Sequence, residues 1–252
     1  MGDLFRNTND LSIASRTTLG DQPEAHHQIQ EGGISMPTIK RALSEQELED
    51  IYRFRYRVYV EEMNRKQEYA DHKRRTVVEP LDTSAQLYGI WTDKEIVGTV
   101  RFNIAAATDT GYYADLYSLD VVAPYYSAHT SLTTKLMVAK THRNLKLAVS
   151  LACTLYRDGK VAGMEFDFID CNDHLVPFFK YMGYRMYKGK VDHPEYGSVN
   201  PMVLVGSDQE YLERVRSPFA SICREFPANE EAVEFFYSNI QPCKEPTTTP
   251  ID

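Results

Sequence analysis

The spacing of hydrophobic and polar residues predicts alternating strands and helices between residues 38 and 240. A capping-box pattern, Ser44 followed three residues later by Glu47, precedes apolar residues at helical intervals and predicts a helix over 45–60. Apolar, β-branched runs at 86–91 and 95–104 flank a polar turn and predict a β-hairpin. A further apolar stripe predicts a helix over 145–156, with Gly159 near its C-cap.

The remaining pattern completes a mixed α/β sheet. Residues 112–122 are ambiguous, and the charged stretch 64–76 is expected to be a loop beside a cleft. The helix before Gly183 should stop at that glycine. Further strands are expected at 38–43, 132–138, 164–171, 184–187 and 202–205, and further helices at 174–182, 209–215 and 230–240.

Composition divides the chain into a body and two tails. Residues 1–36 and 244–252 are poor in aliphatic residues, without sustained periodicity, and are predicted to be disordered. Residues 37–206 are expected to form the α/β domain, and residues 207–243 a C-terminal helical extension. A chain of 252 residues is long enough to bury a large core.

The charge balance limits the possible partners. The chain has 28 Lys and Arg against 36 Asp and Glu, a net charge of -8, whereas a DNA-binding protein needs a basic surplus. DNA is therefore not expected as a partner, and RNA is disfavoured. The four cysteines match no zinc pattern, so no metal is expected. No signal peptide and no apolar run of roughly 20 residues is recognised, which predicts a cytoplasmic protein without a membrane span.

A basic segment leads into the predicted helix over 145–156. Between residues 131 and 160 the chain has six Lys and Arg residues and a single Asp. The turn 140–146 lies at the start of the helix, where free backbone N–H groups and the helix dipole attract anions. This turn is a candidate phosphate site; the alternative is a solvated charged surface.

Three arginines alternate in the first predicted helix, so Arg53, Arg55 and Arg57 cannot all face water on one side. At least one should point inward, and a buried arginine needs a carboxylate. Glu79 and Asp82 are natural partners, and a substrate is another. Both a structural ion-pair network and an acceptor site fit this pattern.

Polar residues also gather where the strand over 164–171 ends and the next helix begins: Asp170, Cys171, Asp173 and His174. Ligands bind at the carboxyl ends of strands in open α/β sheets. His174 is a candidate general base and Cys171 a candidate nucleophile. The alternatives are a histidine bonded to the helix start and a cysteine that fills the core.

These segments resemble the core of GNAT N-acyltransferases. The resemblance rests on the strand, turn and helix over 132–155, the strand ending at Cys171, and the segment 180–184. It implies a GNAT-like α/β fold with a mixed, mostly antiparallel central sheet flanked by helices and a splayed pair of central strands. In that family the turn binds the phosphate of coenzyme A or phosphopantetheine, and a strand amide holds the thioester carbonyl. The matching residues are Arg143, Asn144, Lys146, Leu147 and Ala148 for the phosphate, and Met137 or Val138 for the carbonyl.

The front half is similar to a narrower group. Segments 54–62, 79–82 and 97–101 resemble acyl-homoserine-lactone synthases and, more closely, N-acyl amino acid synthases, as does segment 170–179. The resemblance implies an acyltransferase that moves an acyl group to a small-molecule amine. It favours acyl-phosphopantetheine on acyl carrier protein over acyl-coenzyme A as the donor. It also assigns His174, Asp170 and Tyr181 to catalysis, and Arg55, Glu79, Asp82, Arg101 and Cys171 to the acceptor site.

Two positions depart from the GNAT pattern. Lys146 replaces a glycine, which blocks close backbone approach to phosphate but supplies an ammonium group, and so suits a carrier arm with one phosphate. Phe179 stands where many members have a tyrosine general acid. The leaving thiolate must then take its proton from Tyr181, Tyr184, His174 or water.

Four other functions stay open. Acyl-homoserine-lactone synthesis from S-adenosylmethionine fits the front-half motif, although Trp91 is the only tryptophan and those synthases usually carry several. Coenzyme A-dependent acetyl transfer and a non-catalytic GNAT-fold binding protein are two more. Aminoacyl-tRNA as the donor is disfavoured by the net charge.

Overall fold

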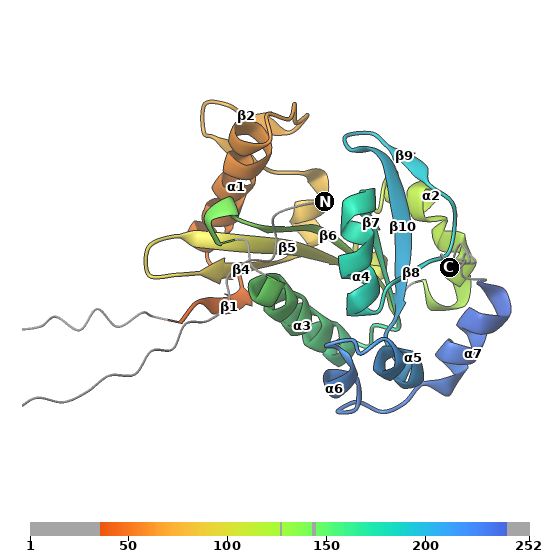
Figure 1. Ribbon diagram of the computed structural model, residues 1–252. Helices are drawn as coiled ribbons and strands as arrows, with labels where there is room; N and C mark the ends of the chain where they lie inside the picture. The colour runs from red at the N-terminus through yellow and green to blue at the C-terminus, as the bar shows by residue number, and fades with distance from the viewer. Residues whose placement is uncertain (1–35, 127, 143–144, 241–252) are drawn as a thin grey trace, which may run out of the picture. The chain divides into compact units, whose positions relative to one another are not determined.

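A computed structural model describes residues 36–126, 128–142 and 145–240. Eight strands form one sheet in the order β1-β4-β5-β6-β7-β10-β8, with β9 paired to β10 off this path (Figure 1). Neighbouring strands are antiparallel except β6 and β7, so the predicted mixed, mostly antiparallel sheet is confirmed. The strands are β1 (Thr38–Arg41), β4 (Gln86–Trp91), β5 (Ile96–Ile104), β6 (Thr130–Val138), β7 (Phe166–Cys171), β8 (Arg185–Met186), β9 (Val191–His193) and β10 (Gly197–Val205).

Helices cover both faces of this sheet. The α-helices are α1 (Glu45–Tyr56), α2 (Tyr113–Tyr117), α3 (Leu145–Val161), α4 (Val176–Met182), α5 (Gln209–Arg214), α6 (Ala220–Cys223) and α7 (Glu230–Asn239). A π-helix (Arg57–Glu62) continues α1, and 3-10 turns occupy Pro80–Ser84, Ala105–Ala107, Leu119–Tyr125, Lys140–His142 and Asp173–Leu175. A separate hairpin joins β2 (Ala70–Asp71) and β3 (Thr76–Val77).

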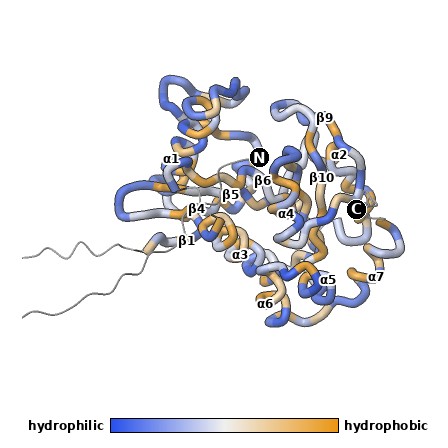
Figure 2. Tube along the Cα trace, in the orientation of Figure 1, coloured by the Kyte–Doolittle hydropathy of each residue, from blue (hydrophilic) through white to orange (hydrophobic). Residues whose placement is uncertain are grey.

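Alternating residues of β10 belong to two different cores. Met202 and Leu204 pack with residues of α3, α4, α5 and α6 on one side, which we call the α3 face. Val203 and Val205 pack with residues of α2 and α7 on the other side, which we call the α2 face. Figure 2 shows hydrophobic residues concentrated in the central strands and α3, with hydrophilic residues in the loops. This alternation is the period-two pattern of a sheet that is buried on both sides.

The two parallel strands separate after a short paired stretch. Thr130–Leu132 of β6 pairs with Phe166–Phe168 of β7, and the described continuations of the strands, to Val138 and Cys171, are not paired with each other. The splayed central strands expected from the family resemblance are therefore present. We call the unpaired stretch beyond Leu132 and Phe168 the gap between β6 and β7.

A bulge in β6 lies beside this gap. The partners of β5 jump from Thr134, opposite Arg101, to Met137, opposite Thr99. Lys135 within the bulge has φ 58°, in the left-handed region that residues with a side chain rarely adopt. Bulges bend a strand and redirect its side chains.

Several boundaries differ from the sequence prediction. The Ser44 capping box is confirmed, but the helix continues as a π-helix to Glu62. Gly159 is not a C-cap: it lies inside α3, where an added Cβ would come within 3.1 Å of Met164. Gly183 does end α4, with φ 109°.

Other elements carried no clear sequence signal. The predicted loop 64–76 contains the β2–β3 hairpin, and the ambiguous stretch 112–122 forms α2 and part of a 3-10 turn. Strand β9 and helix α6 were not expected. The tails predicted at 1–36 and 244–252 fall almost entirely outside the described residues. Within the described part of the chain, no helix is long and apolar enough to cross a bilayer.

Candidate active site

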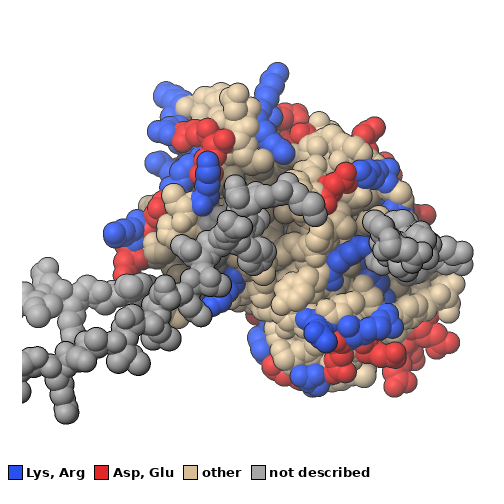
Figure 3. Space-filling model, viewed as in Figure 1, with Lys and Arg blue, Asp and Glu red and all other residues tan. Residues whose placement is uncertain are grey.

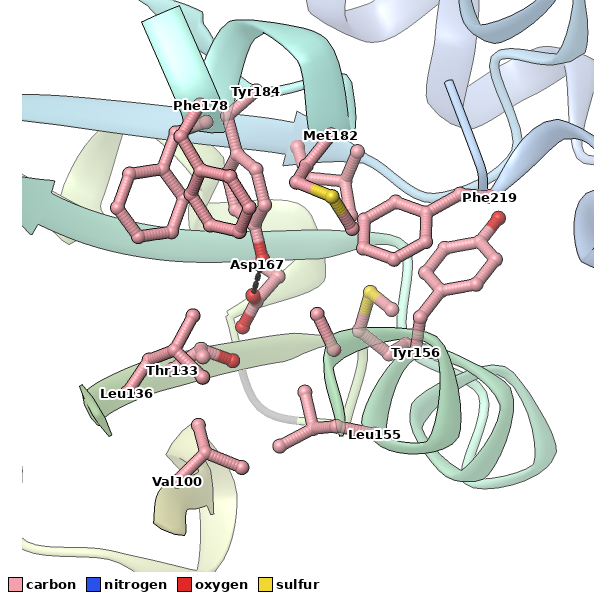
Figure 4. A pocket seen from close by; sticks show the side chains of 14 residues that line it. Val100, Thr133, Leu136, Leu155, Tyr156, Asp167, Phe178, Met182, Tyr184 and Phe219 are labelled. Carbon is pink, nitrogen blue, oxygen red and sulfur yellow. Dashed lines mark hydrogen bonds between the residues drawn. The ribbon is translucent and has the colours of Figure 1, made fainter. Parts of the chain in front are cut away.

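An elongated cavity lies on the α3 face, between β6 and β7 (Figure 4). Its free interior has a volume of only about 10 Å³, room for roughly one water molecule. Apolar side chains from β5, β6, α3, the α3–β7 connection, α4, β10 and the α5–α6 connection form most of its wall: Val100, Leu136, Ala152, Leu155, Met164, Phe178, Phe179, Met182, Leu204 and Phe219. The wall is hydrophobic, but these side chains must move apart before the cavity can hold a hydrocarbon chain.

Polar groups interrupt this apolar lining at one place. Ser131 Oγ and Tyr184 Oη each donate a hydrogen bond of 2.5 Å to the Asp167 carboxylate. Burial raises the pKa of Asp167 to about 6, although hydrogen bonds from Ser131, Tyr184 and Thr133 oppose the rise. The Thr133 hydroxyl lies beside the carboxylate but is poorly aligned for a hydrogen bond to any described residue.

A network of buried charges lies on the other side of the sheet. Arg101 alternates along β5 with Val100, which faces the cavity, so the Arg101 side chain points to the α2 face. Arg55 Nη1 of α1 donates to both oxygens of Asp82 at 2.9 and 2.8 Å, and Arg101 Nη1 donates to Glu79 at 2.6 Å. Both arginine side chains are fully buried.

The acidic side chains are oriented by their own backbone. Pro80 begins a 3-10 turn after Glu79, and the Asp82 carboxylate accepts a 2.7 Å hydrogen bond from the Glu79 N–H. Burial alone would raise the pKa of Glu79, but Lys135 and Arg101 lower it to about 2. Glu79 therefore stays ionised at neutral pH.

Lys135 links this network to a group of aromatic residues. Its ammonium forms an ion pair with Glu79, donates to Tyr196 Oη at 2.6 Å, and lies 5.0 Å from the Tyr59 ring centroid. Glu195, in the turn between β9 and β10, is 3.5 Å away. The bulge in β6 thus brings a lysine next to the strand gap.

His193 stacks on Tyr196 in the same region, with ring centroids 4.3 Å apart. Burial lowers its pKa despite the nearby Asp170, so the ring is neutral at neutral pH. The Glu195 N–H donates to His193 Nδ1 at 3.0 Å, which assigns the ring proton to Nε2. His193 is therefore held as a neutral donor toward Tyr112 Oη, at 3.3 Å.

Some of the buried nitrogens have no partner. Arg55 Nε and Nη2 and Arg101 Nη2 make no hydrogen bond to any described residue. Three cations (Arg55, Arg101 and Lys135) face three carboxylates, Glu79, Asp82 and Glu195, and the Glu195 Oε2 atom is buried 3.5 Å from Lys135. The charges of the network therefore balance, while guanidinium donors of Arg55 and Arg101 stay without a partner among the described residues.

The residues predicted at the end of β7 lie in different environments. Asp170 accepts a 2.6 Å hydrogen bond from Tyr117 Oη of α2, on the α2 face. Its negative charge also acts on His193 and opposes the lowering of the histidine pKa by burial. His174 and Tyr181 are exposed, on the 3-10 turn before α4 and on α4 itself, outside the buried network. Cys171 is buried with its Sγ 3.8 Å from Met202 Sδ, and burial raises its pKa to about 12, so the thiol stays protonated.

The predicted phosphate turn is only partly within the described structure. Arg143 and Asn144 lie outside the described residues. Lys146 is exposed in the first turn of α3, and Leu147 and Ala148 are partly buried. Met137 and Val138 end β6 next to this turn.

Part of the basic segment serves structural ion pairs instead. Besides Lys135, Lys160 is bonded to Glu165 and Arg157 pairs with Glu225 at the surface. Net charge along a sequence cannot separate these residues from exposed ones, because partners come from distant segments.

Sequence reasoning missed several residues of this region. Lys135 was counted only as part of a basic segment, and Asp167, Thr133, His193 and Tyr196 were not singled out. Asp167 did carry a signal, because it is the one charged residue in the apolar run 166–169. For the others, the bulge left no recognisable pattern, whereas Pro194 and Gly197 were an unused turn signal for the β9–β10 hairpin.

The comparisons with known proteins agree with this architecture. Among solved structures, the fold resembles that of FeeM, an N-acyl amino acid synthase from uncultured soil microbes, with a TM-score of 0.56 and 14% identity. That match covers 74% of this chain and 98% of FeeM. The acyl-homoserine-lactone synthase LasI matches with a TM-score of 0.55 and 11% identity, over 69% of this chain and 91% of LasI. BjaI, a coenzyme A-dependent acyl-homoserine-lactone synthase solved with S-adenosylmethionine and isopentyl-coenzyme A, matches with a TM-score of 0.55 and 15% identity, over 73% and 91%.

The fold and the splayed strands are GNAT-like, and the family match makes the protein an N-acyltransferase of this class. The sequence profile of the family described as N-acyl amino acid synthase FeeM matches residues 50–208, and the chain belongs to that family. No curated protein sequence matches the chain significantly.

Proposed function

We propose that the protein transfers an acyl group from the phosphopantetheine thioester of acyl carrier protein to the amino group of an amino acid. The observation that carries this proposal is the separation of β6 from β7, with an apolar cavity on one face of the sheet and a buried charged network on the other. A thioester and a polar amine can then meet at the gap from opposite sides.

The α3 face suits the acyl donor. The acyl chain enters between the apolar side chains of the cavity wall, which move apart to admit it, and the phosphate binds at the start of α3, near Lys146. A backbone amide at Met137 or Val138 holds the thioester carbonyl and stabilises the oxyanion.

A basic surface favours a carrier protein over free coenzyme A. Between Arg53 and Arg75, leaving out the buried Arg55, the chain has seven Lys and Arg residues and four Asp and Glu residues. Figure 3 shows Lys and Arg side chains gathered over α1 and the β2–β3 hairpin. Such a surface attracts an acidic protein domain, because complementary charge speeds association.

The α2 face suits an amino acid. The guanidinium nitrogens of Arg55 and Arg101 that lack a partner among the described residues are suitable donors for an acceptor carboxylate. Asp170 takes the proton from the acceptor ammonium. The free amine then attacks the carbonyl carbon, the C–N bond forms, the C–S bond breaks, and the pantetheine thiolate leaves and is protonated.

The test is product formation by the purified full-length protein, with carrier protein loaded with a ten-carbon acyl chain and a mixture of the twenty amino acids. We expect mass spectrometry to detect an N-acyl amino acid. Lys135→Met should raise KM for the acceptor at least about tenfold, since a charge-assisted contact contributes roughly 1.5–3 kcal/mol. The KM for the donor should change little, and Lys190→Met, at an exposed position paired with Asp173, serves as the matched control.

Parallel reactions separate the alternatives. Product only with acyl-coenzyme A would refute the carrier-protein assignment, and a homoserine lactone formed only with S-adenosylmethionine would refute the amino acid acceptor. The resemblance to LasI and BjaI makes the lactone the main second candidate.

A further inference from the structure

A fully buried tyrosine holds the carboxylate that the proposed function uses as its base. Tyr117 is the last residue of α2, and its Oη donates a 2.6 Å hydrogen bond to Asp170 Oδ1. The Tyr117 ring stacks on Phe168, with ring centroids 6.0 Å apart. Phe168 and Asp170 are two residues apart on β7 and therefore point to the same face of the sheet, so the phenol reaches along the strand from one to the other.

This bond leaves the second oxygen of Asp170 available for chemistry. Asp170 is partly exposed, and its Oδ2 accepts no hydrogen bond from any residue that the structure describes. Since β7 pairs with β6 only as far as Phe168, Asp170 belongs to the unpaired stretch of the strand. Burial raises the pKa of Tyr117 well above its ordinary value, and the charge of Asp170 adds to the rise, so the phenol remains a donor at neutral pH.

Two residues of the β8–β9 connection fix the end of α2 that carries this tyrosine. Tyr187 Oη donates to the Tyr117 carbonyl at 2.6 Å. Lys188 Nζ donates to the Leu116 carbonyl at 3.0 Å and to Ser118 Oγ at 2.6 Å. α2 has only five residues, too few to be stable alone, so these bonds and the core packing determine where Tyr117 lies.

We propose that Tyr117 is a positioning residue for acyl transfer: it holds Asp170 Oδ1 and so fixes the direction in which Oδ2 takes the proton of the acceptor ammonium. A base acts best when a third group holds its orientation. Without the phenol, the carboxyl group of Asp170 can rotate, and a smaller share of the bound complexes has the proton within reach. The donor and the acceptor carboxylate bind to other groups, so their binding should not change. The inference rests on the proposed function, because it takes Asp170 as the base.

The test is a double-mutant cycle, measured by steady-state kinetics on the purified full-length protein. Carrier protein loaded with a ten-carbon acyl chain is the donor, and the acceptor is the amino acid that gives the most product from the mixture of twenty. Tyr117→Phe should lower kcat on the order of tenfold, with both KM values within about twofold of the wild type. In the Asp170→Asn background the same substitution should change kcat by less than about twofold, because Tyr117 acts only through Asp170.

Tyr88→Phe is the matched control. Tyr88 is equally buried, and its Oη donates at 2.7 Å to the carboxylate of Asp158. It lies on β4, with β5 and β6 between it and the gap. Tyr88→Phe should lower the midpoint of urea unfolding by an amount comparable to that of Tyr117→Phe, but should leave kcat unchanged.

Several results would overturn the inference. They are an equal loss of kcat from both tyrosine variants, a wild-type kcat for Tyr117→Phe or for Asp170→Asn, and losses from Tyr117→Phe and Asp170→Asn that multiply in the double variant. Each of these leaves the acyltransferase proposal in place, because the wild-type protein still forms product. If the wild-type protein forms no acyl product with any donor, the proposed function and the inference are both wrong.

Discussion

Asp167 makes stability depend on pH in a direction opposite to that of most carboxylates. It is buried without a cation among the residues that the structure describes, and burial raises its pKa from the ordinary 3.8 to about 6. The folded state thus holds the proton more tightly than the unfolded state. This contribution to stability is complete below pH 3.8 and is lost as the pH rises through about 6.

The magnitude follows from the two pKa values. Each pKa unit corresponds to about 1.4 kcal/mol, so ionising Asp167 costs the folded state about 3 kcal/mol in total, most of it between pH 4 and pH 7. Asp167→Asn keeps the shape of the side chain and removes the titration. The free energy of unfolding of the wild-type protein, measured relative to this variant, should therefore fall by about 2–3 kcal/mol from pH 4 to pH 8.

Urea unfolding of both proteins across this pH range provides the measurement. Titrations elsewhere in the chain cancel in the difference between the two proteins. Asp192→Asn, at an exposed position, is the control and should show a constant difference from wild type. A constant difference for Asp167→Asn as well, or one that moves in favour of wild type as the pH rises, would refute the reasoning.

Two further predictions concern the α2 face. Asp82→Leu should lower the free energy of unfolding by about 3–5 kcal/mol, because it leaves Arg55 buried without a carboxylate. Arg55→Met should lower it less, since Asp82 still has Arg101 at 3.5 Å. Equal losses for the two variants in urea unfolding would contradict this asymmetry. Asp170→Asn should lower kcat on the order of 100-fold with little change in the donor KM, as expected for the loss of a general base. The kcat of His174→Ala, at an exposed position, should stay close to that of the wild type. The reverse pattern in steady-state kinetics would assign the general base to His174.

The fold was largely predictable because it depends on local patterns and on a family resemblance. The capping box at Ser44 and the stop at Gly183 follow from backbone hydrogen bonding and from a positive φ, which the sequence displays directly. The inward arginine could also be predicted, since alternating charges in one helix cannot all reach water. Asp82 was among the partners expected for it, and the pair is Arg55–Asp82.

The site was less predictable because distant segments form it. Lys135 and Lys160 looked like part of an exposed basic stretch, yet each is buried against a carboxylate. Histidine seemed important at 174 because it follows a strand, whereas the histidine buried within the described residues is His193. Its hairpin does carry turn residues, Pro194 and Gly197, but strand β9 before them is too short to show an alternating pattern. Glycine is typical of a helix C-cap, but Gly159 lies inside α3, where its lack of a side chain allows close packing against Met164.

Lys135 must meet two demands that oppose each other. Its backbone conformation, with φ 58°, is one that glycine adopts freely and that costs a residue with a side chain about 1–2 kcal/mol. A glycine or asparagine at this position would relax the chain but would leave Glu79 with Arg101 alone. The protein thus accepts a less stable backbone to keep an ammonium group where its strands diverge.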